Sequence, residues 1–312
     1  MWLLQRIHPP FRQPDSSAPA SRLHPGPSVE TEAIVQQLST HTATRYLQPL
    51  REGGSLPAIV DTNAAGRWVV KFRGAGQGAK VLVAELIVGL LAGELGFPVP
   101  ELALVEVPPQ FGRSEPDPEI QELLQKSHGL NIGLRYLDGA FNFDPYAAGD
   151  LVDDAFASAL VWFDALVTNP DRTHRNPNLM VWERRPWLID HGAALYAHYD
   201  WKTVDEARTR TAFPLIKQHV LLRRATDLEG ADERLAAMLT DEVIAAALAQ
   251  VPDALLLDAV AGAEFESGDE ARERYLRWFR TRLESPRTFA AEAVRARDTA
   301  QAEPPRRTHA RR

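Results

Sequence analysis

The sequence contains no cysteine among its 312 residues. This absence excludes a disulfide framework, a thiolate zinc site and a cysteine nucleophile. An excess of basic residues is also lacking, because the formal net charge is −7. Proteins whose main ligand is nucleic acid usually carry a basic balance, so we expect no nucleic acid as the main partner.

Long uncharged hydrophobic runs are lacking too. The opening stretch Met1–Ile7 is interrupted by Gln5 and Arg6, which makes it too short for the core of a signal peptide. No other run reaches the length needed to span a membrane without a charge. The sequence therefore predicts a cytoplasmic protein with no membrane contact.

What is present suits a globular chain, since 45% of the residues are hydrophobic and the length suggests about two domains. Residues 1–35 are rich in Pro, Ser, Ala and Arg and predict a disordered leader. We expect a strand-rich first domain over residues 36–138 and a helical second domain over residues 139–300. Residues 301–312, with Pro304 and Pro305 before a basic end, predict a disordered tail.

Strand signals dominate the first domain. The β-prone runs Leu56–Asp61 and Arg67–Phe72 flank a segment with Asn63 and Gly66, which suits a hairpin loop. Alternation along the second run places Val69 and Lys71 on one face. The pattern also predicts strands at Leu102–Val107 and Leu130–Leu137, and helices at Ala79–Leu95 and Glu119–Ser127.

Two isolated charges in this domain could pair. Lys71 is a lone cation on its strand face, and Glu85 has only uncharged helical neighbours, so its carboxylate needs a cation if it is buried. Glu94 on the same helix has similar neighbours, so the pattern alone does not choose between the two. Upstream, Gly53, Gly54 and Ser55 precede a strand, where glycines let backbone amides approach a ligand.

Polar residues gather in one short loop of the second domain. An amphipathic helix over Leu151–Val167 leads into the loop Asn169–Asn178, and strands at Leu179–Trp182 and Trp187–Asp190 form a hairpin behind it. Asp171 lies in the loop, whereas Asn178 and Asp190 should lie close together at the open end of the hairpin. Further helices are predicted at Leu235–Leu248, Ala254–Ala261 and Ala271–Leu283.

Such an arrangement is typical of metal-assisted phosphoryl transfer, which needs a cation near the phosphates, oxygen ligands for magnesium and a carboxylate beside the attacking hydroxyl. The carboxamide ligand is ambiguous. Asn176 lies five residues after Asp171, as in kinase catalytic loops, whereas Asn178 directly precedes the strand. The loop residues are also ordinary turn formers, so a structural connector is the alternative interpretation.

Four motifs together resemble the HipA-like kinases, a branch of the protein-kinase-like superfamily. They occur in the expected order within Tyr46–Leu283 and are Gly-Gly-Ser-x-Pro at 53–57, Val-Val-Lys-Phe at 69–72, Asn-x-Asp-Arg-Thr-x-x-Asn-Pro-Asn at 169–178 and Ile-Asp-His-Gly at 189–192. The resemblance implies an α+β, two-lobed protein-kinase-like fold with a strand-rich N-lobe and a helical C-lobe. It also implies that ATP and Mg²⁺ are the cofactors.

The resemblance assigns roles to individual residues. It makes Asp171 the catalytic carboxylate, and makes Asp190 with either Asn176 or Asn178 the magnesium ligands. It makes Lys71 the phosphate-binding lysine and Glu85 its ion-pair partner. The remaining implied contacts are to the nucleotide. The resemblance places Gly53, Gly54 and Ser55 in a loop that covers the phosphates and Val69 in the adenine pocket. It also implies a hinge whose backbone is Arg135, Tyr136 and Leu137.

Departures from the kinase pattern bear on the substrate. His191 replaces the Phe of Asp-Phe-Gly, and no Ala-Pro-Glu follows, so an activation segment of the eukaryotic protein-kinase type is not expected. The resemblance favours Ser or Thr of a protein as acceptor. A small-molecule or lipid hydroxyl and a nucleotide-binding regulatory pseudokinase are the alternatives. An antitoxin-like partner stays open, as does the choice between an autophosphorylated and a simple turn role for Ser55.

Overall fold

The computed structural model describes residues 37–50, 56–76, 78–113, 115–147, 149–258 and 264–302. The predicted leader, 1–35, lies outside these residues, as do 303–312 of the predicted tail. The glycine loop with Gly53, Gly54 and Ser55 also lies outside them.

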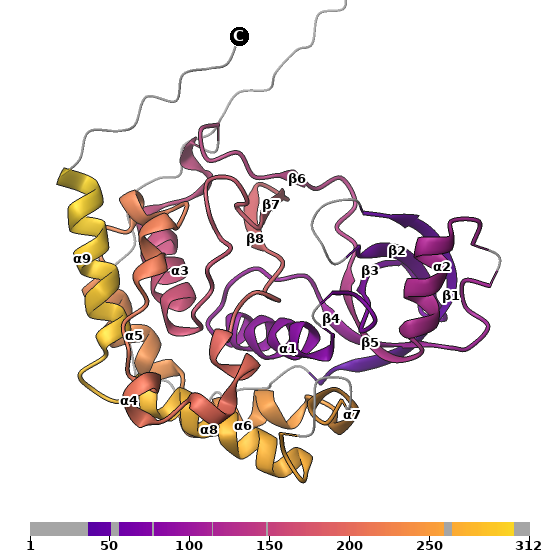
Figure 1. Cartoon of the computed structure of the whole chain (residues 1–312). Helices are drawn as coiled ribbons and strands as arrows, with labels where there is room; N and C mark the ends of the chain where they lie inside the picture. Colours follow the sequence, from indigo (N-terminus) through magenta and orange to yellow (C-terminus); the bar gives the residue numbers. More distant parts are fainter. Residues whose placement is uncertain are drawn as a thin grey trace, which may run out of the picture. The chain divides into compact units, whose positions relative to one another are not determined.

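Five strands of the first lobe form a closed barrel (Figure 1). Their order around the barrel is β1-β2-β3-β5-β4, and neighbouring strands are antiparallel except for the parallel pair β1 and β4. The bounds are β1 Ser39–Pro49, β2 Ala58–Thr62, β3 Arg67–Lys71, β4 Leu102–Val107 and β5 Gly129–Arg135.

The hairpin between β2 and β3 turns where the sequence predicts it. Gly66 has φ +85°, a backbone conformation that residues with a Cβ atom rarely adopt, so the turn favours glycine. Along β3 the side chains alternate as expected, because Trp68 and Val70 pack inside the barrel core while Val69 and Lys71 face the other side. This alternation is what presents Lys71 to the second lobe.

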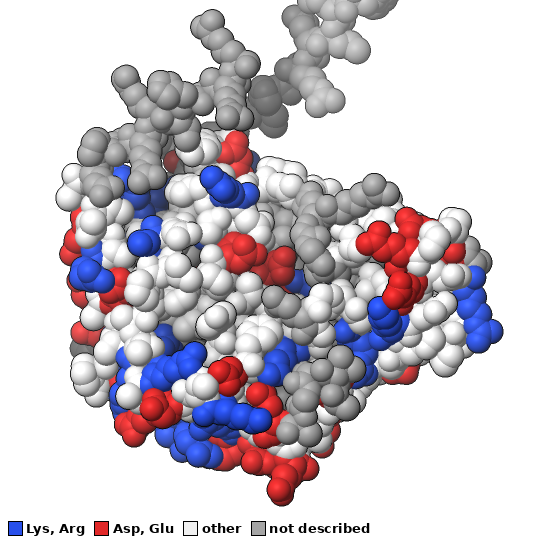
Figure 2. All heavy atoms as spheres, in the orientation of Figure 1, with Lys and Arg blue, Asp and Glu red and all other residues white. Residues whose placement is uncertain are grey.

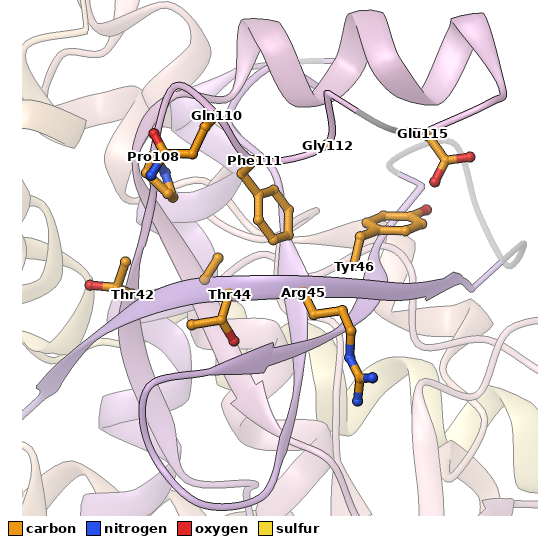
Figure 3. Close-up of a pocket in the computed structure, with 10 residues that line it drawn as sticks. Thr42, Thr44, Arg45, Tyr46, Pro108, Gln110, Phe111, Gly112 and Glu115 are labelled. Carbon is orange, nitrogen blue, oxygen red and sulfur yellow. The ribbon is translucent and has the colours of Figure 1, made fainter.

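Helix α2, Pro118–Lys126, packs Ile120, Leu123 and Leu124 into the same barrel core. Asp117 caps its first turn by accepting a hydrogen bond from Glu119 N–H. Beside α2, the β1–β4 pairing stops at Thr42, and a cavity of about 590 Å³ opens between β1 and the loop after β4. Figure 3 shows Tyr46 and Phe111 pointing into this cavity, which contains none of the predicted site residues.

Helix α1, Ala79–Glu94, is apolar on nearly every side and is buried accordingly. It contacts β4 and β5 of the barrel on one side and helices of the second lobe, α6 and α7, on the other. The helix ends before Gly96, whose φ is +82°. Because α1 contacts both lobes, a polar residue in its middle, such as Glu85, can reach partners in each of them.

The second lobe is mostly helical. A three-stranded sheet in the order β6-β7-β8 adjoins it. The strands are β6 Phe141–Asn142, β7 Leu179–Trp182 and β8 Arg185–Leu188. The α-helices are α3 Asp154–Leu166, α4 Glu206–Thr209, α5 Leu228–Met238, α6 Asp241–Ala249, α7 Asp253–Leu256, α8 Gly268–Leu283 and α9 Thr288–Ala302. Short 3-10 turns are η1 Gly149–Leu151, η2 Tyr196–Tyr199, η3 Trp201–Thr203, η4 Pro214–Gln218 and η5 Leu222–Arg224.

A strand-rich region followed by a mostly helical one is the predicted architecture, but several element boundaries differ from the prediction. The helix expected over Leu235–Leu248 is two helices, because Thr240 caps the start of α6 through Val243 N–H. Strand β8 ends at Leu188 rather than Asp190, since Asp190 has φ +56° and leaves the extended conformation. The helix expected over Ala254–Ala261 is shorter, because α7 ends at Leu256.

Candidate active site

Charged side chains of both signs are interspersed on the face drawn in Figure 2, as on an ordinary solvated surface. Two clusters contain buried charges, and the first includes Lys71. Nζ of Lys71 lies 2.8 Å from Oε2 of Glu85 and 2.6 Å from Oδ1 of Asp190. The side chain of Glu85 is 0% exposed and that of Lys71 is 7% exposed. Glu94, the alternative on the same helix, is only half-buried and lines a separate small cavity.

This cluster keeps Lys71 charged. Burial alone would lower the pKa of Lys71, but the carboxylates of Glu85 and Asp190 outweigh it and hold the pKa above its ordinary value. Burial raises the pKa of Glu85, and Lys71 opposes that rise. Burial would also raise the pKa of Asp190, yet the ammonium group of Lys71 lowers it overall. A fixed cation therefore faces an ionised aspartate at the junction of β3, α1 and the residues after β8.

The Asp-His-Gly segment is held against α1. Oε2 of Glu85 accepts a second hydrogen bond from His191 N–H, at 2.8 Å. A Cβ atom on Gly192 would lie 2.5 Å from Cγ1 of Val81, so the close approach to α1 requires glycine. Asp190 adopts a left-handed conformation that Asp tolerates better than most residues. These contacts aim the Asp190 carboxylate at Lys71.

The polar loop after α3 surrounds Asp171 with amides. Asp171 N–H donates to Oδ1 of Asn169 at 3.0 Å, which closes a local turn. Oδ2 of Asp171 accepts hydrogen bonds from the side-chain amides of Asn176, at 2.8 Å, and Asn178, at 3.1 Å. Because Nδ2 of each carboxamide donates to Asp171, the Oδ1 atoms of Asn176 and Asn178 remain available to accept from or coordinate other partners. The loop thus combines one carboxylate with two amide oxygens.

Asn178 connects this loop to the β7–β8 hairpin. It is buried, has φ +46°, and its carbonyl accepts a hydrogen bond from Ile189 N–H at 3.1 Å. The predicted closeness of Asn178 to the Asp190 end of the hairpin is therefore present in the backbone. Asn176, in contrast, is exposed.

A buried ionic network lies beneath the loop. Arg172 donates from Nε to Oδ2 of Asp164 at 2.6 Å, and both side chains are 0% exposed. His219 also contacts Oδ2 of Asp164, at 2.9 Å, and Asn169 donates to Oδ1 at 3.1 Å. Although burial would raise it, Arg172 and His219 lower the pKa of Asp164 to about 2. Arg172 also donates to the carbonyl of Asn178, so the network fixes both ends of the loop.

Comparison with known proteins gives a family match. The family described as HipA-like kinase matches residues 44–258, more than half of the chain. The chain belongs to the HipA-like kinase family. Membership identifies this HipA-like kinase as a phosphotransferase of the protein-kinase-like type that uses ATP.

The fold is also that of a solved kinase. The crystal structure of the proinflammatory kinase CtkA from Helicobacter pylori matches with a TM-score of 0.50 and 11% sequence identity. The match covers 84% of this chain and 99% of CtkA. A search of curated protein sequences returned no match. Within the described part of the HipA-like kinase, no helix is long and apolar enough to cross a membrane.

The predicted hinge of the HipA-like kinase follows β5. Arg135 N–H donates to the carbonyl of Glu101 at 2.8 Å, and Tyr136 N–H donates to that of Arg67 at 3.0 Å. Leu137 N–H has no hydrogen-bond partner among the described residues. Val69 pairs with Leu134 across β3 and β5 and shares the face of Lys71. Of the three hinge residues, Leu137 is thus the one with a backbone donor left for a ligand.

Sequence reasoning missed Asp164 and His219, and did not foresee what His191 does. Asp164 carried a signal, because it is a carboxylate among apolar residues in the second half of α3. No sequence pattern pointed to His219, because it lies 55 residues after Asp164 in the sequence. His191 is buried at 1% exposure, with Nδ1 3.5 Å from Nη2 of Arg172. His191 stands at the sequence position of the Phe in Asp-Phe-Gly, and its Nδ1 accepts a hydrogen bond from Arg172.

His191 should make stability depend on pH. Burial, with Arg172 adding to it, lowers the pKa of His191 from 6.5 to about 3. Between these values the unfolded chain binds the extra proton, so the free energy of unfolding is highest above pH 6.5 and falls as the pH drops. His191→Phe should reduce this slope by up to about 1.4 kcal/mol per pH unit. Denaturant unfolding at a series of pH values measures it, and equal slopes would contradict a buried neutral His191.

Proposed function

We propose that this HipA-like kinase transfers the γ-phosphoryl group of ATP, with Mg²⁺, to the hydroxyl of a serine or threonine in a protein. The observation that carries the proposal is the position of Lys71, whose ammonium group contacts Glu85 and Asp190 together. A second support is that Asn178 joins the Asp171 loop to the hairpin that leads to Asp190.

The donor set fits magnesium. Carboxylate and carboxamide oxygens are its preferred ligands, and it is usually held by one or two carboxylates together with substrate phosphates. Among the described residues, no group of three His, Cys, Asp or Glu is placed to hold a metal ion. We propose Asp190 and Asn178 as the protein ligands. When bound, the ion would neutralise charge on the phosphates of ATP.

In the proposed reaction each residue has a separate task. Asp171 orients the acceptor hydroxyl and accepts its proton as the new oxygen–phosphorus bond forms and the bond to the β-phosphate oxygen breaks, so that ADP leaves. Lys71 holds the phosphates, and Glu85 fixes Lys71. Leu137 N–H and Val69 bind the adenine, and the sequence motif alone assigns the phosphates to Gly53, Gly54 and Ser55, which lie outside the described residues.

Substituting the two amides separately tests the metal assignment. Asn178→Ala should raise the magnesium concentration needed for half-maximal activity by at least about 10-fold, because it removes a ligand oxygen. Asn176→Ala should shift it less, since Asn176 is exposed and hydrogen-bonds to Thr173 and Asp171 of its own loop. Magnesium titrations of both variants give the comparison. A larger shift in Asn176→Ala would reassign the ligand to Asn176.

The acceptor class is tested with ATP labelled at the γ-phosphate. We expect label to appear on serine or threonine of proteins, including the enzyme itself, in a magnesium-dependent reaction. Label that enters only small molecules or lipids would move the assignment to those hydroxyls. Absence of any transfer or ATP hydrolysis, together with stabilisation by ATP, would identify a nucleotide-binding pseudokinase instead.

A further inference from the structure

We propose that Lys80 is a positioning residue that locks α1 onto the second lobe, so that the Lys71–Glu85 pair forms without phosphorylation of the segment after β8. The part of this inference that is tested by kinase activity rests on the proposed function. Nζ of Lys80 lies 2.7 Å from the carbonyl oxygen of His198 in η2 and 2.7 Å from Oε2 of Glu264. The side chains of Lys80 and Glu264 are only 17% and 16% exposed.

Local helix chemistry does not explain a lysine at this position. Lys80 lies in the first turn of α1, where the helix dipole disfavours a cation. The N-cap residue is Gly78, which offers no side-chain hydrogen bond, and the first turn has no acidic residue. Lys80 is therefore unfavourable for α1 itself, and its contacts outside the helix are what compensate.

The acceptor of Lys80 is itself fixed. His198 is fully buried, and its Nδ1 lies 2.9 Å from the hydroxyl of Tyr275 in α8. The ring of Tyr199 packs edge-on against His198 at 4.5 Å between centroids, and Nζ of Lys80 lies 6.0 Å from the centre of the Tyr199 ring. The lysine thus connects α1 to a turn that is anchored on α8.

Glu85 follows Lys80 by five residues, which is about 7.5 Å along the helix axis. A pivot of α1 about this end would draw Glu85 away from both Lys71 and His191 N–H, since both contacts depend on the position of the helix. In many kinases a phosphate bound by cations holds this helix and the activation segment in place. Here the carboxylate of Glu264 and the carbonyl of His198 provide a permanent partner for the cation.

Kinetics of three lysine variants test the lock. Lys80→Met should lower kcat/KM for ATP by about 10²-fold, the loss typical when a distant change misplaces catalytic groups. Lys80→Arg, which keeps the cation, should recover most of the activity. Lys126→Met is the matched control, because Lys126 pairs with Glu122 on the exposed face of α2. The double variant Lys80→Met/Glu264→Gln removes the unpaired carboxylate, and its activity should stay low.

A second readout does not depend on catalysis. Amide hydrogen exchange in the first turns of α1 should become faster in Lys80→Met than in the wild type, while exchange in α2 is unchanged. Treatment of the wild-type enzyme with a phosphatase should leave its activity unchanged. The inference would be overturned if Lys80→Met had the same kinetics and the same amide exchange as the wild type. Loss of activity of the wild-type enzyme after phosphatase treatment would also overturn it. If the wild type transfers no phosphate, the proposed function fails, and the exchange experiment alone decides the role of Lys80.

Discussion

Replacing Asp171 by alanine is expected to lower kcat by about 10²–10⁴-fold, the usual contribution of a general base. Binding of ATP should be nearly unchanged, because Asp171 contacts Asn176 and Asn178 rather than the Lys71 cluster. A loss in kcat without a matching loss in ATP affinity is the signature of a group that acts in the chemical step. Steady-state kinetics together with ATP-induced thermal shifts measure the two quantities.

Asp269→Ala is a suitable control for this experiment, since its side chain is 96% exposed on α8 and pairs only with Arg272. It should behave like the wild type. Unchanged turnover in Asp171→Ala would remove Asp171 from the catalytic role.

Lys71→Met is the second change with a large expected effect. We expect kcat to fall by about 10²–10³-fold, comparable to the loss of one charge-stabilising donor in other active sites. Stability should fall by about 3–5 kcal/mol, because the carboxylate of Glu85 is left buried without its cation. Activity assays and denaturant unfolding measure the two effects separately.

The double variant Lys71→Met/Glu85→Gln separates packing from chemistry. Removing the unpaired carboxylate should restore part of the stability, because a neutral amide is less costly to bury. Activity should stay low, since the phosphate-binding cation is still missing. Recovery of activity along with stability would show that Lys71 serves the fold rather than the reaction.

Simple periodicity was enough to predict much of this kinase. Alternation along β3 placed Val69 and Lys71 on one face, and the apolar run of α1 predicted a buried helix that contains Glu85. The predicted hairpin brought Asn178 to the segment that leads to Asp190. These features depend on local patterns, which a sequence displays directly.

Other features depend on contacts across the chain. The choice of Glu85 over Glu94 required the depth of each residue at the lobe junction, and His219 reaches Asp164 from 55 residues away. The end of β8 depends on the left-handed backbone of Asp190, which the contacts of His191 and Gly192 with α1 impose. At the break between α5 and α6, Thr240 caps the start of α6 by accepting a hydrogen bond from Val243 N–H.

We expect the residues around Lys71 and Asp171 to transfer phosphate to protein hydroxyls. Comparing phosphorylated sites in protein extracts exposed to wild-type enzyme or to Asp171→Ala, with ATP and Mg²⁺, tests it most directly. We predict serine and threonine sites that appear only with the wild type. An identical set of phosphorylated sites in both samples, while both proteins still bind ATP, would contradict the account.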